Sequence, residues 1–230
     1  MLILALDTTT RAGSVAVLHG MTVLFEGAGD PDRTYGERLP LDLQRALDAA
    51  GVQLRDVELF AVAAGPGSFT GLRIGIATVQ GMAVAAGRKI VPVSALDAAA
   101  RSAGGTAARV AAWMDAQRGE VAGALYGPTG RDLVIPAAAA APAALLHAWL
   151  SSETLADTRF VGDGAVRYRD VIVSALGAAV TVAPAPLLAG VIGRIAAEAP
   201  QKAVVPHAVV PIYVRQSDAE LARARRGESR

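Results

Sequence analysis

The sequence predicts an α/β protein of two lobes, each built around a sheet whose strands run in mixed directions. Apolar runs at the N-terminus, separated by tight turns, predict a strand meander at residues 2–6, 14–18 and 21–25. Helical and strand patterns then alternate as far as residue 103, which is typical of a mixed sheet covered by helices. After Gly104-Gly105 the opening order of strand, terminal aspartate, turn and strand begins again, which predicts a second lobe.

The composition is that of a folded globular chain. Of 230 residues, 53% are hydrophobic and 19% are charged, so the chain has enough apolar surface to bury a core. The net charge of +1 gives no strong overall field toward nucleic acid or an acidic membrane. The absence of cysteine excludes a disulfide framework, a thiolate zinc site and a cysteine nucleophile, and it fits a reducing cytoplasm.

No membrane span is expected. The longest apolar run, residues 133–150, is interrupted by Pro136 and Pro142 and consists mostly of alanine. The N-terminus has no basic region and reaches Asp7 too soon for a signal peptide. We therefore expect a cytoplasmic protein.

In the first lobe, assigned to residues 1–103, glycines and serines mark the element ends. Leucines recur at helical spacing up to Gly51, which we expect to end a helix, and Gly87 is expected to end another. Ser68 and Ser94 are in position to cap the helices that follow them. The expected elements after the meander are helix 39–50, strand 57–64, helix 71–86 and strand 89–93.

The second lobe, assigned to residues 104–215, follows a shortened version of the same plan, and residues 216–230 form a charged C-terminal tail. By analogy, such a repeat indicates a ribonuclease H-like fold of the actin-like ATPase superfamily with a degenerate second lobe. The expected elements are strands 109–114, 120–126 and 159–161, helices 142–150, 166–176 and 187–199, and an extended segment 203–215.

The turn after the first strand is a candidate nucleotide site. Asp7 at a strand end, followed by the hydroxyls of Thr8 and Thr10, has the chemistry that magnesium and a phosphate need. The alternative is that these side chains satisfy the backbone of their own turn. Asp115 takes the equivalent place in the second lobe, but its turn, residues 117–119, holds a single glycine. Asp7, Thr8, Thr10 and Asp115 are therefore a candidate vestigial nucleotide site, while for Asp115 and Arg118 a structural role at the lobe junction is the favoured alternative.

The glycine-rich turn at Gly65–Gly75 leads into a helix that is apolar on nearly every side. No Gly-Lys-Ser/Thr follows, so the turn is not a Walker A loop, and its spacing does not fit a dinucleotide fingerprint. Gly71 and Gly75 lie four residues apart, which allows another backbone to approach closely. A helix that is apolar all round must be covered on two sides, by the sheet and by either the helix at 39–47 or a partner chain.

Metal and nucleophile signatures are absent from the sequence. The histidines His19, His147 and His207 are scattered and form no His-x-x-x-His pair. The serine in Gly67-Ser68-Phe69 is not part of a Gly-x-Ser-x-Gly elbow. We therefore expect no catalytic residue and no metal site in this chain.

Five segments together resemble a known family. They are, in order, LILALDTTT, GPGSFTGLRIGIATVQGMA, DAQRGEV, GDGAVRY and PIYVR, and they resemble the bacterial TsaB family, also called YeaZ. The resemblance runs from the first strand to about Arg215, and the long glycine-rich segment is its most specific part. The family usually has His-Ser-Glu where this chain has Tyr35-Gly36-Glu37, and Pro40 comes one position early.

The resemblance implies a non-catalytic subunit of the complex that forms N6-threonylcarbamoyladenosine in tRNA, beside the anticodon. Such a subunit pairs with the catalytic TsaD through its first two helices, is joined by the ATPase TsaE, and meets tRNA only through the complex. It requires no cofactor of its own, although the complex uses ATP and magnesium, and it is open to homodimerisation when isolated. Carried onto this sequence, the interface comprises Tyr35, Glu37, Leu39, Leu43, Leu47, Gly71, Arg73, Gly75, Thr78, Val79 and Met82.

The rival hypothesis is a self-sufficient ATP-dependent small-molecule kinase of the actin-like superfamily. Asp7, Thr10 and Asp115 would then hold a magnesium nucleotide, and the missing second phosphate turn argues against it. A metallopeptidase is opposed by the histidine pattern.

Overall fold

The computed structural model describes residues 1–214, so Arg215 and the predicted tail 216–230 lie outside the described residues. The first sheet contains β1 (Leu2–Asp7), β2 (Ser14–His19), β3 (Thr22–Ala28), β4 (Leu59–Gly65) and β5 (Ile90–Ser94). The helices of this part are α1 (Tyr35–Ala50), η1 (Leu54–Asp56), α2 (Phe69–Ala86) and α3 (Ala95–Ala103).

The second sheet contains β6 (Arg109–Asp115), β7 (Val121–Tyr126), β8 (Leu133–Ala140), β9 (Thr158–Val161) and β10 (Thr181–Ala183). Its helices are α4 (Pro142–Leu150), α5 (Asp163–Arg167) and α6 (Arg169–Leu176). The chain then continues through α7 (Ala189–Glu198), η2 (Pro200–Lys202) and η3 (Pro206–Ala208).

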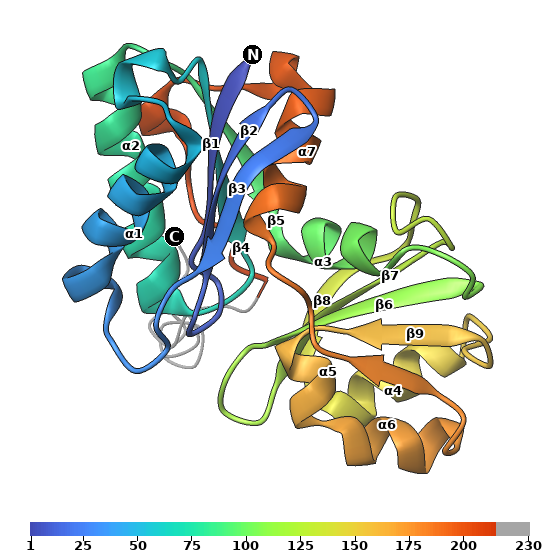
Figure 1. Ribbon diagram of the computed structural model, residues 1–230. Coiled ribbons are helices and arrows are strands. Elements are labelled where there is room, and N and C mark those ends of the chain that lie inside the picture. Colours follow the sequence, from blue (N-terminus) through green and yellow to red (C-terminus); the bar gives the residue numbers. More distant parts are fainter. Residues whose placement is uncertain (215–230) are drawn as a thin grey trace, which may run out of the picture.

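The two sheets have the same topology (Figure 1). Each has five strands, in the order β3-β2-β1-β4-β5 and β8-β7-β6-β9-β10. In each, the first three strands form an antiparallel meander and the last two run parallel to the central one. This repeated order confirms the predicted two-lobed, ribonuclease H-like α/β fold.

The predicted helix ends are confirmed by their capping geometry. Gly51 takes a left-handed conformation at φ 68° and closes α1, as Gly87 does for α2 at φ 65°. The Ser68 hydroxyl accepts a hydrogen bond from the Gly71 amide at 3.2 Å, and Ser94 caps α3 in the same way.

Two strands of the second sheet were not predicted. β8 contains Pro136 and a run of alanines, residues with low strand propensity, and it forms because it pairs with β7 along the sheet edge. β10 is only three residues long, too short for an alternating pattern to show. The predicted helix 166–176 is divided at Tyr168 into α5 and α6.

The final helix returns to the first lobe. The amides of Ala189 and Gly190 at the start of α7 donate to Ser14 Oγ at 3.0 Å and Glu26 Oε1 at 2.7 Å. Val204 then exchanges backbone hydrogen bonds with Ile90 on β5. The structure therefore differs from the predicted division, which placed all of residues 104–215 in the second lobe, because the pattern of a helix does not say which sheet it covers.

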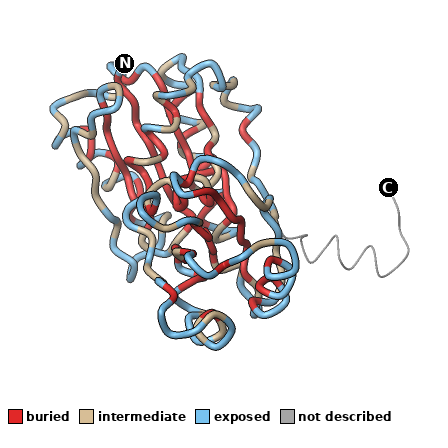
Figure 2. The backbone as a smooth tube through the Cα atoms, turned by 90° about the vertical axis from the view of Figure 1, so that its right-hand side faces the viewer, coloured by how far each residue is buried: buried red, intermediate tan, exposed pale blue. Residues whose placement is uncertain are grey.

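Each sheet has helices on both faces. In the first lobe, α1 and α2 cover one face and α7 the other (Figure 1). α3 lies between the sheets and contacts β4, β5 and β6. One buried cluster therefore extends through both lobes, formed largely by alanines of α3 and small residues of both sheets. Figure 2 shows the buried residues, in red, mostly inside the fold and the exposed residues, in pale blue, mostly around them.

α2 is, within residues 1–214, the single helix that is long and apolar enough to cross a membrane. Its inward side packs against β4, burying Leu72, Ile76 and Val79. We interpret α2 as a core helix of the first lobe, since such helices satisfy the same criterion.

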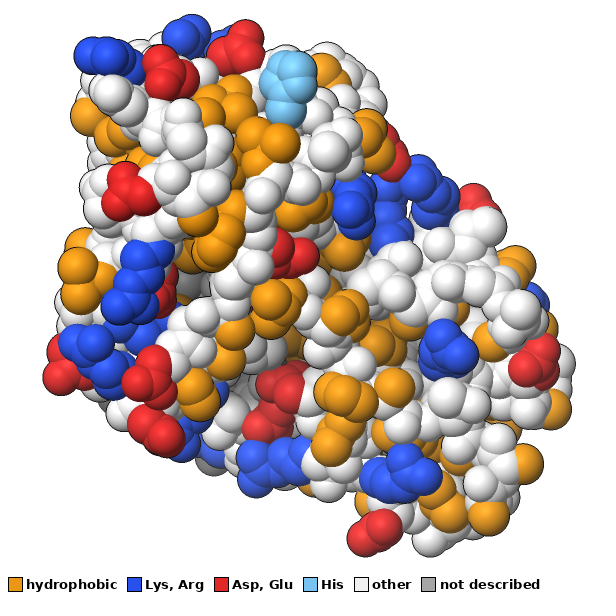
Figure 3. Space-filling view, viewed as in Figure 1, with side chains coloured by type: hydrophobic (Ala, Val, Ile, Leu, Met, Phe, Trp, Pro, Cys, Tyr) orange, Lys and Arg blue, Asp and Glu red, His pale blue; other side chains and the backbone are white. Residues whose placement is uncertain are grey.

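An ionic cluster joins the lobes at the ends of α3 and α7. Glu198 accepts hydrogen bonds from Arg101 at 2.6 Å and from both terminal nitrogens of Arg131, each at 2.8 Å. Arg131 lies on the loop between β7 and β8, so Glu198 links a first-lobe helix to the second lobe. The hydrogen bonds from these arginines lower the pKa of Glu198 to about 2. The molecular surface is hollowed between the lobes, with Lys and Arg side chains beside the junction (Figure 3).

Replacing Glu198 with Gln is expected to lower the free energy of unfolding by about 1 kcal/mol at neutral pH, since the pairs are partly exposed. The carboxylate stabilises the fold fully above its ordinary pKa of 4.5, and this contribution disappears as pH falls toward about 2. Chemical denaturation across this range should show a weaker acid dependence in Glu198→Gln. Glu153→Gln, which removes a pair within the second lobe, is the control; equal acid dependence in both variants and wild type would contradict the prediction.

Candidate functional site: the β1–β2 turn and its surroundings

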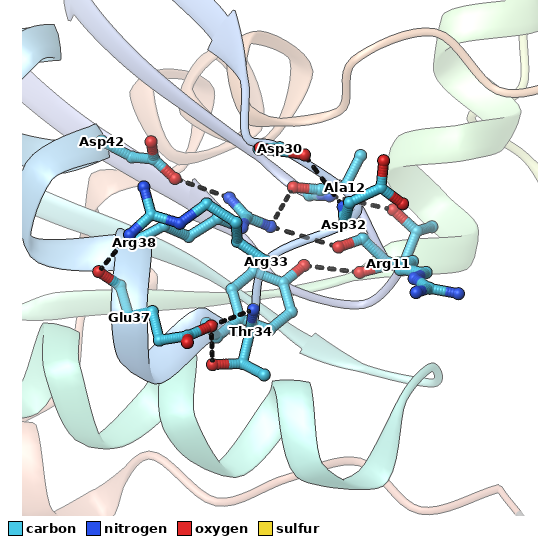
Figure 4. Close-up of polar contacts among 12 residues, drawn as sticks. Arg11, Ala12, Asp30, Asp32, Arg33, Thr34, Glu37, Arg38 and Asp42 are labelled. Atoms are coloured by element: carbon cyan, nitrogen blue, oxygen red, sulfur yellow. Dashed lines mark hydrogen bonds and ion pairs between the residues drawn. The ribbon is translucent and has the colours of Figure 1, made fainter.

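The turn between β1 and β2 lies beside the start of α1 (Figure 4). Thr34 precedes α1, and its amide and hydroxyl both donate to Glu37 Oε2, at 2.8 and 2.7 Å. These hydrogen bonds lower the pKa of the exposed Glu37. Glu37, predicted as a partner contact, therefore forms part of a capping box that fixes the start of α1.

Arg38 is the buried centre of this region and is only 3% exposed. Its guanidinium pairs with Asp42 on the next turn of α1 and donates to the carbonyls of Arg11 and Ala12 in the β1–β2 turn. Gly29 leaves room for it, since a Cβ there would overlap the guanidinium. Arg38 thus ties α1 to the turn. Arg38 is not among the residues predicted from the sequence, although its spacing of four residues from Asp42 is a signal of a helical ion pair.

Tyr35 also makes its contacts within the same chain. Its hydroxyl donates to the carbonyl of Thr10, and its ring lies 4.4 Å from the Arg38 guanidinium carbon. Burial, followed by the charge of Asp7, raises the pKa of Tyr35 well above its ordinary value. The predicted partner residue is therefore a support of the β1–β2 turn, with its hydroxyl already used.

α2 packs on the other side of the same turn through its glycines. A Cβ at Gly71 would overlap the carbonyl oxygen of Thr8, and one at Gly75 would overlap Thr8 Oγ1 and lie 2.9 Å from Thr8 Cγ2. Gly67 meets Thr9 in the same way. The close approach inferred from the glycine spacing therefore exists, but its neighbour is the β1–β2 turn of the same chain. This corrects the placement of Gly71 and Gly75 in a partner interface.

The other predicted interface residues fall into two groups: those that face the sheet and are buried, and those that are at least partly exposed. Leu39, Leu43, Leu47 and Val79 are buried in the cluster between α1, α2 and the first sheet, so they are corrected to core residues. Thr78 and Met82 are half-buried and Arg73 is exposed. The outer sides of the two helices instead present a different set, namely Leu41, Phe69, Ala77, Gly81, Val84 and Ala85. The periodic spacing of apolar residues in α1 and α2 therefore identifies the sides that face the sheet, not the sides that are exposed.

Asp7 satisfies its own turn. One oxygen of this 3% exposed side chain accepts hydrogen bonds from the amide and the hydroxyl of Thr9, at 2.8 and 2.6 Å. Burial raises the pKa of Asp7, and the negative charge of Asp163 across the junction adds to this effect. The local hydrogen bonds are those expected from the structural interpretation of Asp7.

Asp115 is engaged in a corresponding way. Its two oxygens accept from the amide and side-chain nitrogen of Gln117, at 3.1 and 2.9 Å, and Arg167 donates to Oδ2 at 2.8 Å. Asp163, which is not among the predicted site residues, accepts a hydrogen bond from the Asp115 amide at 3.0 Å. Within residues 1–214 no three His, Cys, Asp or Glu side chains come together to hold a metal. Asp115 is thus held by side chains of its own lobe.

A family model and several curated relatives match this chain. The family model described as TsaD, tRNA N6-adenosine threonylcarbamoyltransferase, matches residues 31–221. The tRNA threonylcarbamoyladenosine biosynthesis protein TsaB of Escherichia coli is 41% identical over 128 residues, which are 55% of each chain. The chain thus spans about half the length of the curated relatives it matches.

Solved structures extend the match over nearly the whole chain. YeaZ from Pseudomonas aeruginosa is 32% identical with a TM-score of 0.77, covering 92% of this chain and 99% of YeaZ. The ethanolamine utilization protein EutJ of Carboxydothermus hydrogenoformans, at 14% identity and a TM-score of 0.51, shows the fold alone.

Fold and site together define a two-lobed protein of the actin-like ATPase fold. Its aspartates at the ends of β1 and β6, Asp7 and Asp115, accept hydrogen bonds from the chain's own side chains. The family match covers most of the chain and the YeaZ structure nearly all of it. The chain belongs to the TsaB (YeaZ) family.

Replacing Arg38 with Met is expected to lower the free energy of unfolding by about 3 kcal/mol, because it leaves the partly buried Asp42 carboxylate and two turn carbonyls without their hydrogen-bond donor. Urea denaturation measures the change. Arg45→Met, on the exposed side of α1, is the matched control and should be nearly neutral. Equal losses in the two variants would show that Arg38 does not hold the turn.

A pair of glycine substitutions on α2 separates inner from outer packing. Gly75→Ala is expected to cost about 1–3 kcal/mol, because the new methyl group overlaps Thr8. A methyl group added at Gly81 would meet nothing within 4 Å, so Gly81→Ala is expected to stabilise the helix by up to about 1 kcal/mol. Thermal unfolding of both variants tests the contrast, and a stabilised Gly75→Ala would refute it.

Proposed function

We propose that this chain is the non-catalytic, pairing subunit of the complex that forms N6-threonylcarbamoyladenosine in tRNA, beside the anticodon. The observation that carries the proposal is the family membership of a chain whose aspartates at the ends of β1 and β6 accept hydrogen bonds from its own residues. Asp115 is held by Gln117 and Arg167, and Asp7 by Thr9. Such carboxylates support the fold and leave the chemistry to a partner.

The partner is a TsaD-type transferase, which the chain binds and activates. A tRNA N6-adenosine threonylcarbamoyltransferase of Cereibacter sphaeroides is 39% identical over 93 residues, or 38% of this chain. From this similarity we expect the partner to carry a similar helix pair, so that two like faces meet about an approximate two-fold axis. On this chain, the exposed outer side of α1 and α2 is that face. The isolated chain can use the same face to homodimerise.

The remaining roles follow from this assignment. A TsaE-type ATPase joins the pair, tRNA contacts this chain only through the complex, and the assembly works in the cytoplasm. ATP and magnesium are used by the complex, while this chain requires no cofactor.

Gly81→Arg tests the helix face. The bulky charge on the outer side of α2 is expected to abolish co-purification with the TsaD-type subunit of the same organism, while circular dichroism and the melting temperature stay near wild type. Gly105→Arg is the control, because Gly105 is also open but lies on the loop between the lobes. Unchanged pairing of Gly81→Arg would remove the outer face of α2 from the interface; failure of the wild-type chains to pair at micromolar concentration would overturn the proposed function.

Calorimetry with ATP and magnesium on the isolated chain distinguishes the kinase alternative. We expect neither tight binding nor turnover, since Arg167 already pairs with Asp115. Tight binding with ATP turnover would favour the self-sufficient kinase.

A further inference from the structure

The last described segment runs along α2 and is fixed at several points. Gln80 Nε2 donates to the carbonyls of Pro206 and Val209, at 2.9 and 3.1 Å, and Val209 is buried. The Ile212 amide donates to the carbonyl of Ala64 on β4 at 2.6 Å. These contacts hold residues 206–213 as a firm edge of the first lobe.

At the end of this segment, three exposed side chains form a cluster. The rings of Phe69 and Tyr213 stack with centroids 5.5 Å apart. Arg73 lies over the Phe69 ring at 4.0 Å and donates from Nε to the Tyr213 hydroxyl at 3.2 Å. We call Phe69, Arg73 and Tyr213 the Phe69 cluster.

The Phe69 cluster is unusual for this chain because aromatic residues are scarce. The sequence has four Phe, four Tyr and two Trp, all within residues 1–214, and only Phe69 and Tyr213 among them are exposed, at 49% and 46%. Val210 and Ile212 beside them are 66% and 42% exposed. Aromatic rings and arginine in an exposed apolar setting are the composition of interface hot spots.

The Phe69 cluster continues the outer face of α2. Phe69 and Arg73 begin a row at four-residue spacing, followed by Ala77, Gly81 and Ala85, and every member is exposed. The small members allow a partner helix to come close, while the cluster supplies large rings at one end. The row is therefore continuous with the face assigned above to the TsaD-type partner.

Charge indicates what the partner must present. Among the described residues, no carboxylate pairs with Arg73, and its hydrogen bond to Tyr213 uses Nε alone. An apolar pocket edged by a carboxylate would complement the two rings and the guanidinium together. A single-stranded nucleic acid is a poorer match, because Val210 and Ile212 add apolar surface where a nucleic-acid site has further cations.

We propose that the Phe69 cluster, with Val210 and Ile212, anchors the interface with the TsaD-type subunit, so that the segment after α7 is a second contact stretch beside the helix pair. This inference rests on the proposed function. Because hydrogen bonds to Gln80 and Ala64 already fix the segment, it loses little conformational entropy on binding.

The test is titration calorimetry of the full chain against the TsaD-type subunit, with Phe69→Ala, Tyr213→Ala and Arg73→Glu. Each substitution is expected to raise the dissociation constant about tenfold or more, while the melting temperature stays near wild type. Tyr213→Phe keeps the stacked ring and is expected to lose less affinity than Tyr213→Ala. Leu150→Ala, which removes a side chain 46% exposed on the second lobe, is the matched control.

The outcomes separate this inference from the proposed function. If wild type binds and the three cluster variants bind equally well, the anchor is refuted while the helix-face assignment stands. If wild type itself does not bind, the proposed function fails and the anchor fails with it. Loss of binding to a labelled single-stranded RNA, or loss of self-association, with unchanged partner binding would also overturn the proposal.

Discussion

The close packing of α2 on the β1–β2 turn is the constraint on which the first lobe depends. Gly67, Gly71 and Gly75 bring the helix against Thr8 and Thr9 at a distance that no side chain would allow. With the glycines inside, Leu72, Ile76 and Val79 are buried against the sheet, and the row from Phe69 to Ala85 is left outside. Arg38 and Tyr35 hold the same turn from α1, so both helices are positioned by one short loop.

Much of the fold could be predicted from the sequence because its signals are local. The strand meander, the left-handed Gly51 and the caps at Ser68 and Ser94 depend on a few neighbouring residues. β8 could not be predicted, since its alanine run becomes a strand only through pairing with β7. The side on which each helix residue lies was inferred wrongly for Gly71 and Gly75, because four-residue spacing shows that something comes close without showing what it is.

The candidate site shows the same limit. The aspartates at the two strand ends were visible in the sequence, and so was the choice between ligand binding and local hydrogen bonding. Arg167 was not, because it is 52 residues away from Asp115 in sequence. Tyr213 is 140 residues from Arg73, so their contact likewise needs the folded chain. Contacts between residues so far apart in sequence determine whether a carboxylate at a strand end is available to a ligand or is hydrogen-bonded within the fold.

The return of α7 to the first sheet makes the second lobe an insertion between two parts of the first. Ser14 and Glu26 contact a helix that the ribosome produces 175 and 164 residues later, and Leu18 packs against the same helix. During synthesis, the second sheet is complete before the first lobe receives its last helix, and the buried face of the first sheet remains uncovered until then. A chain shortened before Ala189 would therefore lose the cover of the N-terminal sheet while keeping every strand of the second one.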